Sequence, residues 1–168
     1  MTVTYIGIGS NLGDRIRNCT QALDLLGRIP GCRVMARSPW YLTRPVGVEK
    51  QEWYLNGVAC LECDLSGHDL LNRVLAIESE MGRVRSESWG PRIIDLDLLL
   101  FGKEIVNSIE LKVPHPLMHT RRFVLVPMAQ IAPHLVHPAL CRTMEELLQD
   151  LDGEGQEVIP YEAVGADL

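Results

Sequence analysis

The chain has 168 residues, of which 46% are hydrophobic and 23% charged, which is typical of one globular domain with a sizeable core and too short for two ordinary ones. Its net charge of −6 argues against nucleic acid as a partner, and no apolar run approaches the roughly 20 residues that cross a bilayer. Five cysteines form no even framework and favour free thiols in a reducing compartment, so we expect a soluble, cytoplasmic protein.

In chain order, the first half of the sequence predicts three strands and one helix. Residues 3–8 alternate and are β-branched, as is typical of a strand. Asn11, with Asp14 three residues later, predicts the start of a helix that ends near residue 27. Two more strand candidates cover 33–42 and 54–63, and the segment 43–53 between them contains Pro and Gly, shows no period and predicts a loop.

The second half predicts a capped helix, an apolar strand and two short helices. Ser66 and Asp69 form a capping pattern at the start of a helix that Gly82 ends. Residues 93–101 predict a central strand, and short helices are expected at 121–131 and 144–151. The order strand, helix, strand, strand, helix, strand predicts an α+β fold of ferredoxin-like type, with helices packed on an antiparallel sheet. We expect a single domain over residues 1–168, with a mobile acidic tail from about residue 153.

Two carboxylates interrupt the most apolar of these strands. Asp95 and Asp97 are two residues apart and therefore share one face, while Ile94, Leu96 and Leu98 point to the core. Close carboxylates repel each other, and burying either one unpaired is costly. Magnesium removes both problems, because it binds one or two carboxylates and completes its shell with water and substrate phosphates. By itself, however, a DxD is more often a solvated strand face.

Arginines surround the two carboxylates in the sequence. Arg83, Arg85 and Arg92 precede them, and Arg121 and Arg122 follow. For any single arginine, a solvated charge or a salt bridge to one Asp is the more common explanation. Guanidinium groups nevertheless suit phosphate oxygens, and a metal beside arginines is the usual equipment for phosphoryl transfer. The combination therefore predicts a phosphate-handling magnesium site.

A few polar and aromatic residues suit a flat heterocyclic substrate. Tyr54 and Asn56 share one strand face, where the amide can read a heterocycle edge and the ring of Tyr54 or Phe123 can stack on its plane. Trp89 lies in a rigid Gly-Pro turn. Core packing and a cross-strand hydrogen bond explain each of these residues equally well when it is taken alone. Glu78 lies within the apolar stripe of its helix, either at the edge of the stripe or reaching into a cleft.

Several motifs together resemble the 6-hydroxymethyl-7,8-dihydropterin pyrophosphokinase family. They span residues 6 to about 138 in the family's order and are IGSNLGD, TRPVG, YLN, GRVR, WGPRIIDLDLLLFG, VPHP, RRFVLVPM and IAPHLVHP. The resemblance implies transfer of pyrophosphate from ATP to the hydroxymethyl oxygen of the dihydropterin, which gives AMP and the pterin diphosphate in folate biosynthesis. It also implies two Mg²⁺ ions held by the DxD pair. Arg44 departs from the pattern, because the family often has proline there.

The resemblance also implies a role for each matching residue. Arg83, Arg92, Asp95 and Asp97 are expected to be catalytic, with the two aspartates as metal ligands. Contacts to the pterin are expected from Thr43, Pro45, Val46, Gly47, Tyr54, Asn56, Trp89 and Phe123. Contacts to ATP are expected from Glu78, Arg85, Trp89, Arg92, Leu98, His115 and Arg121. We expect a monomer that acts on small molecules, with neither nucleic acid nor membrane as a partner.

Two other functional classes stay open at this point. One is a non-catalytic nucleotide-binding module that keeps the scaffold, which the intact DxD and WGPR motifs disfavour. The other is a DxD-dependent glycosyl or nucleotidyl transferase, which has no need for the YLN and TRPVG pair. Pterin binding and the identity of the nucleotide product separate these classes from a pyrophosphokinase.

Overall fold

The computed structural model describes residues 1–46, 51–82 and 92–162, and its main feature is an antiparallel sheet. Neighbouring strands follow the order β5-β1-β4-β3-β8, and β2 also pairs with β4. The strands are β1 (Thr2–Ser10), β2 (Cys32–Arg37), β3 (Tyr41–Thr43), β4 (Tyr54–Cys63), β5 (Asp95–Phe101) and β8 (Val158–Pro160). A separate two-stranded ladder joins β6 (Val106–Asn107) to β7 (Lys112–Val113).

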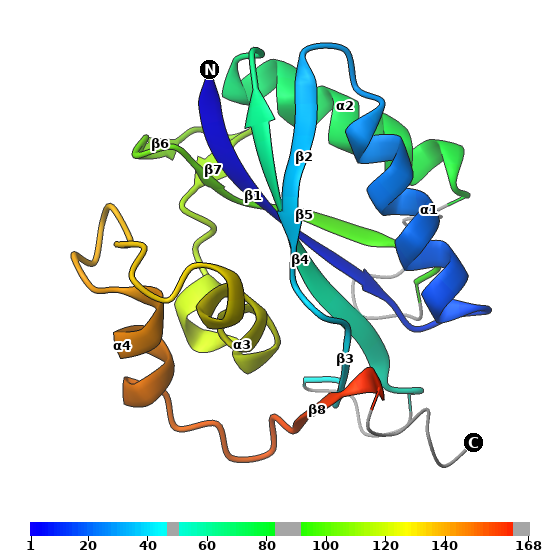
Figure 1. Ribbon diagram of the computed structural model, residues 1–168, viewed down its shortest axis with the longest axis vertical. Coiled ribbons are helices and arrows are strands. Elements are labelled where there is room, and N and C mark those ends of the chain that lie inside the picture. The colour runs from blue at the N-terminus through cyan, green and yellow to red at the C-terminus, as the bar shows by residue number, and fades with distance from the viewer. Residues whose placement is uncertain (47–50, 83–91, 163–168) are drawn as a thin grey trace.

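Helices cover both faces of this sheet. Figure 1 shows α1 (Arg15–Gly27) and α2 (Gly67–Glu80) on one side, and α3 (Arg122–Ile131) and α4 (Met144–Asp150) on the other. A short 3₁₀ helix, η1 (Met118–Thr120), precedes α3. With α1 and α2 as crossovers, the strands β5, β1, β4 and β2 have the ferredoxin-like order, which confirms the predicted α+β fold.

The apolar strand β5 is an edge strand, and the prediction of a central position was wrong. Among the described residues it pairs only with β1. Leu96 and Leu98 face the core under α1 and α2, whereas Leu99 and Leu100 face the core under α3. Burial on both faces therefore accounts for the continuous apolar run. The outer edge is also covered, because Glu78 Oε2 accepts a hydrogen bond from Leu96 N at 2.8 Å.

The predicted strand 33–42 is divided into β2 and β3. Pro39 has no N–H to donate to a β-ladder. Ser38 Oγ accepts a hydrogen bond from Val58 N of β4 at 2.9 Å. Trp40 then packs against Gly57, where an added Cβ would come within 2.6 Å of the indole ring. The pairing register on β4 therefore changes at this point, and β3 pairs with the first three residues of β4.

The helix starts follow the predicted capping chemistry with one correction. Asp14, not Asn11, caps α1, and its Oδ1 accepts a hydrogen bond from Arg17 N at 3.2 Å. Asn11 instead forms hydrogen bonds with the backbone of Arg92. At α2, Ser66 Oγ accepts from Asp69 N at 3.2 Å, as predicted.

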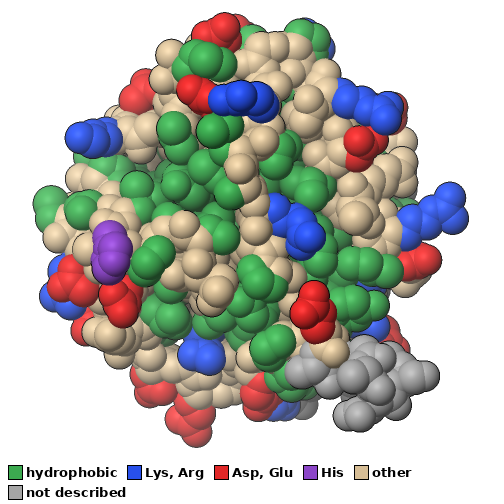
Figure 2. All heavy atoms as spheres, in the orientation of Figure 1, with side chains coloured by type: hydrophobic (Ala, Val, Ile, Leu, Met, Phe, Trp, Pro, Cys, Tyr) green, Lys and Arg blue, Asp and Glu red, His purple; other side chains and the backbone are tan. Residues whose placement is uncertain are grey.

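The C-terminal segment, which was expected to be mobile, contributes β8 to the sheet. β8 pairs antiparallel with β3, so that Val158 lies opposite Thr43 and Pro160 opposite Tyr41. The face seen in Figure 2 has hydrophobic side chains in its middle, with basic and acidic side chains interspersed around them. Within the described ranges, no helix combines the length and apolar character that a bilayer crossing demands.

Candidate active site

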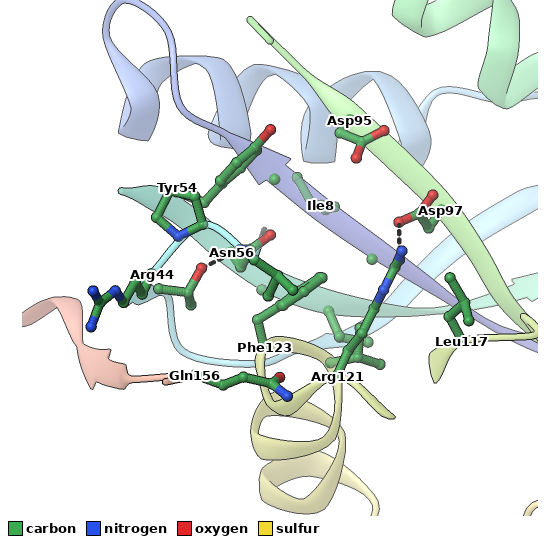
Figure 3. Close-up of a pocket in the computed structure, with 18 of the residues that line it drawn as sticks. Ile8, Arg44, Tyr54, Asn56, Asp95, Asp97, Leu117, Arg121, Phe123 and Gln156 are labelled. Carbon is green, nitrogen blue, oxygen red and sulfur yellow. Dashed lines mark hydrogen bonds and ion pairs between the residues drawn. The ribbon is translucent and has the colours of Figure 1, made fainter. Parts of the chain in front are cut away.

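A pocket of about 340 Å³ opens on the side of the sheet that α3 covers. Its size is within the range of small-molecule sites. Residues from β1, β3, β4, β5, the start of α3 and the C-terminal segment line it (Figure 3). One end is built of neutral polar and aromatic groups, and the other end carries the two aspartates.

The neutral end is organised around Asn56. Its Nδ2 donates to Thr43 Oγ1 at 2.6 Å, and both residues are buried, with 8% and 2% of their surface exposed. Tyr54 and Phe123 lie on either side of Asn56 in Figure 3. The hydroxyl of Thr43 therefore fixes the orientation of an amide in a pocket that Tyr54 and Phe123 also line.

Two glycines make the floor of the pocket. In the β1–β5 ladder, Gly7 lies opposite Asp97 and Gly9 opposite Asp95, and in the β1–β4 ladder Gly9 lies opposite Asn56. An added Cβ at Gly9 would collide with the side-chain oxygen of Asn56. The spacing of two residues, which puts both glycines on one face of a strand, was the available signal for this floor.

The charged end brings Asp95 and Asp97 together on one face of β5, as predicted. Arg92 Nη1 lies 3.4 Å from Asp95 Oδ1, and Arg121 Nη1 lies 4.0 Å from Asp97 Oδ2. The carboxylate side chains are 26% and 29% exposed. Each carboxylate therefore faces the pocket with a guanidinium loosely paired to it.

The donor set at this end fits a magnesium ion. Two carboxylates are within the number that Mg²⁺ takes from a protein, with water and phosphate oxygens completing its octahedral shell. Within the described ranges, no group of three or more His, Cys, Asp or Glu side chains could hold a metal. The arrangement therefore suits a hard cation that shares its shell with a substrate, not a closed structural zinc site.

Arg121 connects the two ends of the pocket. Its guanidinium carbon lies 5.5 Å from the centroid of the Phe123 ring, a cation–π distance. The same guanidinium reaches toward Asp97. Movement at the start of α3 would therefore disturb both the aromatic wall and the charged end.

Asn11 supports the charged end of the pocket through hydrogen bonds, and the sequence reasoning missed this position. Its Oδ1 accepts from Arg92 N at 2.8 Å, and its own backbone N–H donates to Arg92 O at 3.0 Å. Its Nδ2 donates to Gln51 Oε1 at 3.0 Å. Asn11 thus joins the end of β1, the segment that leads into β5 and the loop after β3. The available signal was its position directly after the strand that carries the two glycines.

Glu78 and Leu98, both predicted to contact ATP, lie outside the pocket lining. Glu78 is buried, with 1% of its surface exposed, and its carboxylate binds the backbone between the two aspartates, at Leu96 N. The side chain of Leu98 packs in the core under α1 and α2. Their nucleotide roles stay predictions.

His115 lies beside the charged end and also outside the pocket lining. Its Nδ1 accepts from Leu117 N at 3.1 Å, and its backbone N–H donates to Leu99 O at 2.8 Å. Burial, reinforced by the positive charge of Arg121 and opposed by Asp95, lowers the pKa of His115 from 6.5 to about 4. The imidazole is therefore neutral at pH 7.

Ten predicted site residues line this one pocket. They are Thr43, Pro45, Val46, Tyr54, Asn56, Arg92, Asp95, Asp97, Arg121 and Phe123. Gly47, Arg83, Arg85 and Trp89, also predicted, lie outside the described residues.

Comparison with known proteins adds three findings. Residues 5–133 match the family model described as 7,8-dihydro-6-hydroxymethylpterin-pyrophosphokinase (HPPK). Relatives named 2-amino-4-hydroxy-6-hydroxymethyldihydropteridine pyrophosphokinase are 43% identical over 157 residues in Methylorubrum extorquens (94% of this chain, 98% of the relative) and 45% identical over 156 residues in Pseudomonas aeruginosa (93% and 96%).

A solved structure gives the third finding, which concerns the fold alone. The HPPK-DHPS of Plasmodium falciparum, crystallised with SDX-DHP, is similar with a TM-score of 0.68 at 13% identity. The match covers 89% of this chain and 43% of that one, so the chain spans less than half the length of this structural neighbour.

Proposed function

The chain belongs to the 7,8-dihydro-6-hydroxymethylpterin-pyrophosphokinase family, and from that premise we propose how its residues divide the work. It is a transferase of folate biosynthesis that moves pyrophosphate from ATP to the hydroxymethyldihydropterin. The observation that carries the assignment of roles is the single pocket that joins Asn56 at one end to Asp95 and Asp97 at the other.

The neutral end binds the pterin. Asn56, oriented by Thr43, offers hydrogen bonds to the heterocycle edge, and Tyr54 and Phe123 hold its faces. Pro45 and Val46 add apolar contact from the segment after β3, and we extend this set to Gly47 and Trp89. Because the amide is already oriented, little side-chain entropy is lost when the pterin binds.

The charged end binds the triphosphate. Asp95 and Asp97 hold Mg²⁺, for which we propose two ions, and the metal when bound supplies positive charge to the phosphate oxygens. Arg92 and Arg121 exchange their carboxylate partners for phosphate oxygens, which suits their bidentate geometry. We assign Arg83 and Arg85 to the same triphosphate, and Glu78, Leu98 and His115 to the nucleotide side.

The two ends together place the hydroxymethyl oxygen of the pterin in line with the β-phosphorus of ATP. A bond forms between these two atoms while the bond from the β-phosphorus to the α,β-bridging oxygen breaks. AMP leaves with that bridging oxygen, and the proton of the hydroxymethyl group is released to water. The contribution of the protein is positioning and charge neutralisation, with no covalent intermediate on the chain.

The wider setting is also proposed. Residues 1–168 act as a single domain and as a monomer in the cytoplasm, on small molecules, without nucleic acid or membrane. The mixed charges on the face in Figure 2 support the exclusion of nucleic acid. Sedimentation at micromolar concentration is expected to give the mass of one 18.8 kDa chain, and a dimer mass would contradict the monomer.

The nucleotide product tests the reaction. Incubation with ATP, magnesium and the hydroxymethyldihydropterin is expected to yield AMP and the pterin diphosphate in equal amounts. Release of ADP would indicate an ordinary kinase. ATP binding by calorimetry without turnover would indicate a nucleotide-binding module, and failure to bind the pterin beside a non-hydrolysable ATP would favour a different DxD transferase.

A further inference from the structure

The helix that carries Phe123 begins without a cap of its own. Its N-cap residue is Arg121, whose side chain is a donor only and makes no capping hydrogen bond among the described residues. The first backbone N–H groups of a helix have no partner within the helix and need an acceptor from elsewhere. At α3 that acceptor is Gln156, whose Oε1 accepts from Arg122 N at 2.9 Å across 34 residues of sequence.

The same side chain also binds the backbone before Arg121. Gln156 Nε2 donates to Thr120 O at 3.2 Å. One amide thus bridges the peptide groups on both sides of Arg121. Figure 3 shows the Gln156 amide beside the base of Arg121 and below Phe123. Because both polar atoms of the amide are engaged by the backbone, Gln156 is built to hold this turn.

The segment that carries Gln156 is itself anchored to the opposite wall of the pocket. The next residue, Glu157, accepts a backbone hydrogen bond from Arg44 N at 3.1 Å and forms a side-chain ion pair with Arg44 at 3.2 Å. β8 then pairs with β3, which contains Thr43. The C-terminal segment therefore links the β3 wall of the pocket to the start of α3.

We propose that Gln156 is a positioning residue, which caps α3 from the C-terminal segment and thereby holds Arg121 and Phe123 in their places in the pocket. Without this cap the first turn of α3 opens more often. Only the closed fraction binds substrates, so the apparent affinity falls in proportion to that closed fraction. This effect on turnover rests on the proposed function, whereas the capping of α3 does not.

The test compares Gln156→Ala with Gln149→Ala, which changes an exposed glutamine of α4. Loss of a helix cap is expected to speed hydrogen exchange at the Arg122 amide about fivefold in the ligand-free protein. The kcat/KM for the dihydropterin is expected to fall as well, but by less than fivefold, because the closed fraction falls by a smaller factor than the open fraction rises, while Gln149→Ala changes neither quantity. Gln156→Glu keeps an acceptor at the positive end of the helix, so it is expected to restore most of the Arg122 protection.

The exchange and turnover measurements together test whether Gln156 caps α3. Unchanged exchange at Arg122 in Gln156→Ala would overturn the proposal. Loss of turnover with unchanged exchange would also overturn it, because the side chain would then act directly on the substrate. If the unmodified protein formed no AMP, the proposed function would fail, and the exchange comparison would still decide whether Gln156 caps α3.

Discussion

The two ends of the pocket are built on different physical principles. At the neutral end, called the pterin end below, Asn56 and Thr43 are buried and joined by a hydrogen bond of 2.6 Å. At the charged end, called the metal end below, Asp95 and Asp97 are partly exposed and face arginines at 3.4 and 4.0 Å. At the first end a buried hydrogen bond already orients the amide, whereas at the second end each carboxylate lies near a guanidinium group that also suits phosphate oxygens.

This difference separates recognition from chemistry. A buried, oriented amide discriminates between heterocycles, because a wrong partner leaves a polar group unsatisfied. The two arginines lie 3.4 and 4.0 Å from their carboxylates, and a guanidinium group suits phosphate oxygens as well as carboxylate oxygens, so each arginine can exchange one anionic partner for the other. Variants at the metal end should therefore lose turnover while keeping pterin affinity, and variants at the pterin end should do the reverse.

The largest effect is expected at the metal end. Asp97→Ala removes a proposed metal ligand and should lower kcat by roughly 10³-fold or more, since charge neutralisation dominates phosphoryl transfer. Asp95→Ala should lower kcat to a similar extent. Pterin affinity, measured by fluorescence titration without nucleotide, should stay within about threefold. Near-normal kcat in either variant would remove that residue from the metal site, and the exposed Asp24→Ala is a matched control.

A methyl group at Gly9 should weaken pterin binding by displacing the Asn56 amide. The added Cβ of Gly9→Ala collides with the Asn56 amide oxygen, and displacing that amide should weaken pterin binding by roughly 30- to 100-fold. Gly7→Ala is the comparison, because its Cβ would have its nearest neighbours at 3.6 Å, an ordinary contact. Calorimetry with the pterin should show the larger loss for Gly9→Ala, and equal losses would contradict the role of Asn56.

A subtler change at the same end concerns the hydroxyl of Thr43. Thr43→Val keeps the shape but removes the acceptor for Asn56 Nδ2. The loss of one buried hydrogen bond should weaken pterin binding by about five- to tenfold. Thr43→Ser retains the hydroxyl and should bind nearly as well as the unmodified protein. If both variants bound equally, the orientation of Asn56 would not depend on this bond.

The last prediction concerns protein stability near the charged end of the pocket, and neither turnover nor binding. Folding lowers the pKa of His115 from 6.5 to about 4, so the unfolded chain holds more protons between these values. The contribution of His115 is therefore fully present above pH 6.5 and is lost as the pH falls toward 4. Urea unfolding from pH 7 to pH 4.5 should show a smaller decline for His115→Asn. The exposed His68→Asn should decline like the unmodified protein, and identical profiles for all three would refute the assignment.

The sequence was sufficient for features that depend on local pattern. The alternation around Asp95 and Asp97 correctly predicted their common face, and Ser66 with Asp69 correctly predicted the start of α2. Spacing and residue type suggested a heterocycle site at Tyr54 and Asn56, whereas the resemblance supplied the pterin roles of Thr43, Pro45 and Val46. These features are readable because residues close in sequence determine them.

Features that depend on contacts between distant residues could not be predicted from the sequence. The division of the predicted strand 33–42 rests on packing between Trp40 and Gly57. Asn11 looked like a helix cap, because its partners Arg92 and Gln51 are 81 and 40 residues away. The edge position of β5 was hidden by helices on both faces. In each case the deciding contact lies far along the chain, where no local period reports it.

The pairing of β8 with β3 has a practical consequence for anyone who handles this protein. A purification tag or fluorescent label joined just after β8 is attached to a wall of the pocket, because that strand pairs with β3 and begins two residues after Gln156, which lines the pocket. The first residues of β1 lie at the far end of the strand from Gly7 and Gly9, and Figure 1 shows the N-terminus well away from β8. Fusion partners and surface-immobilisation linkers therefore belong at Met1.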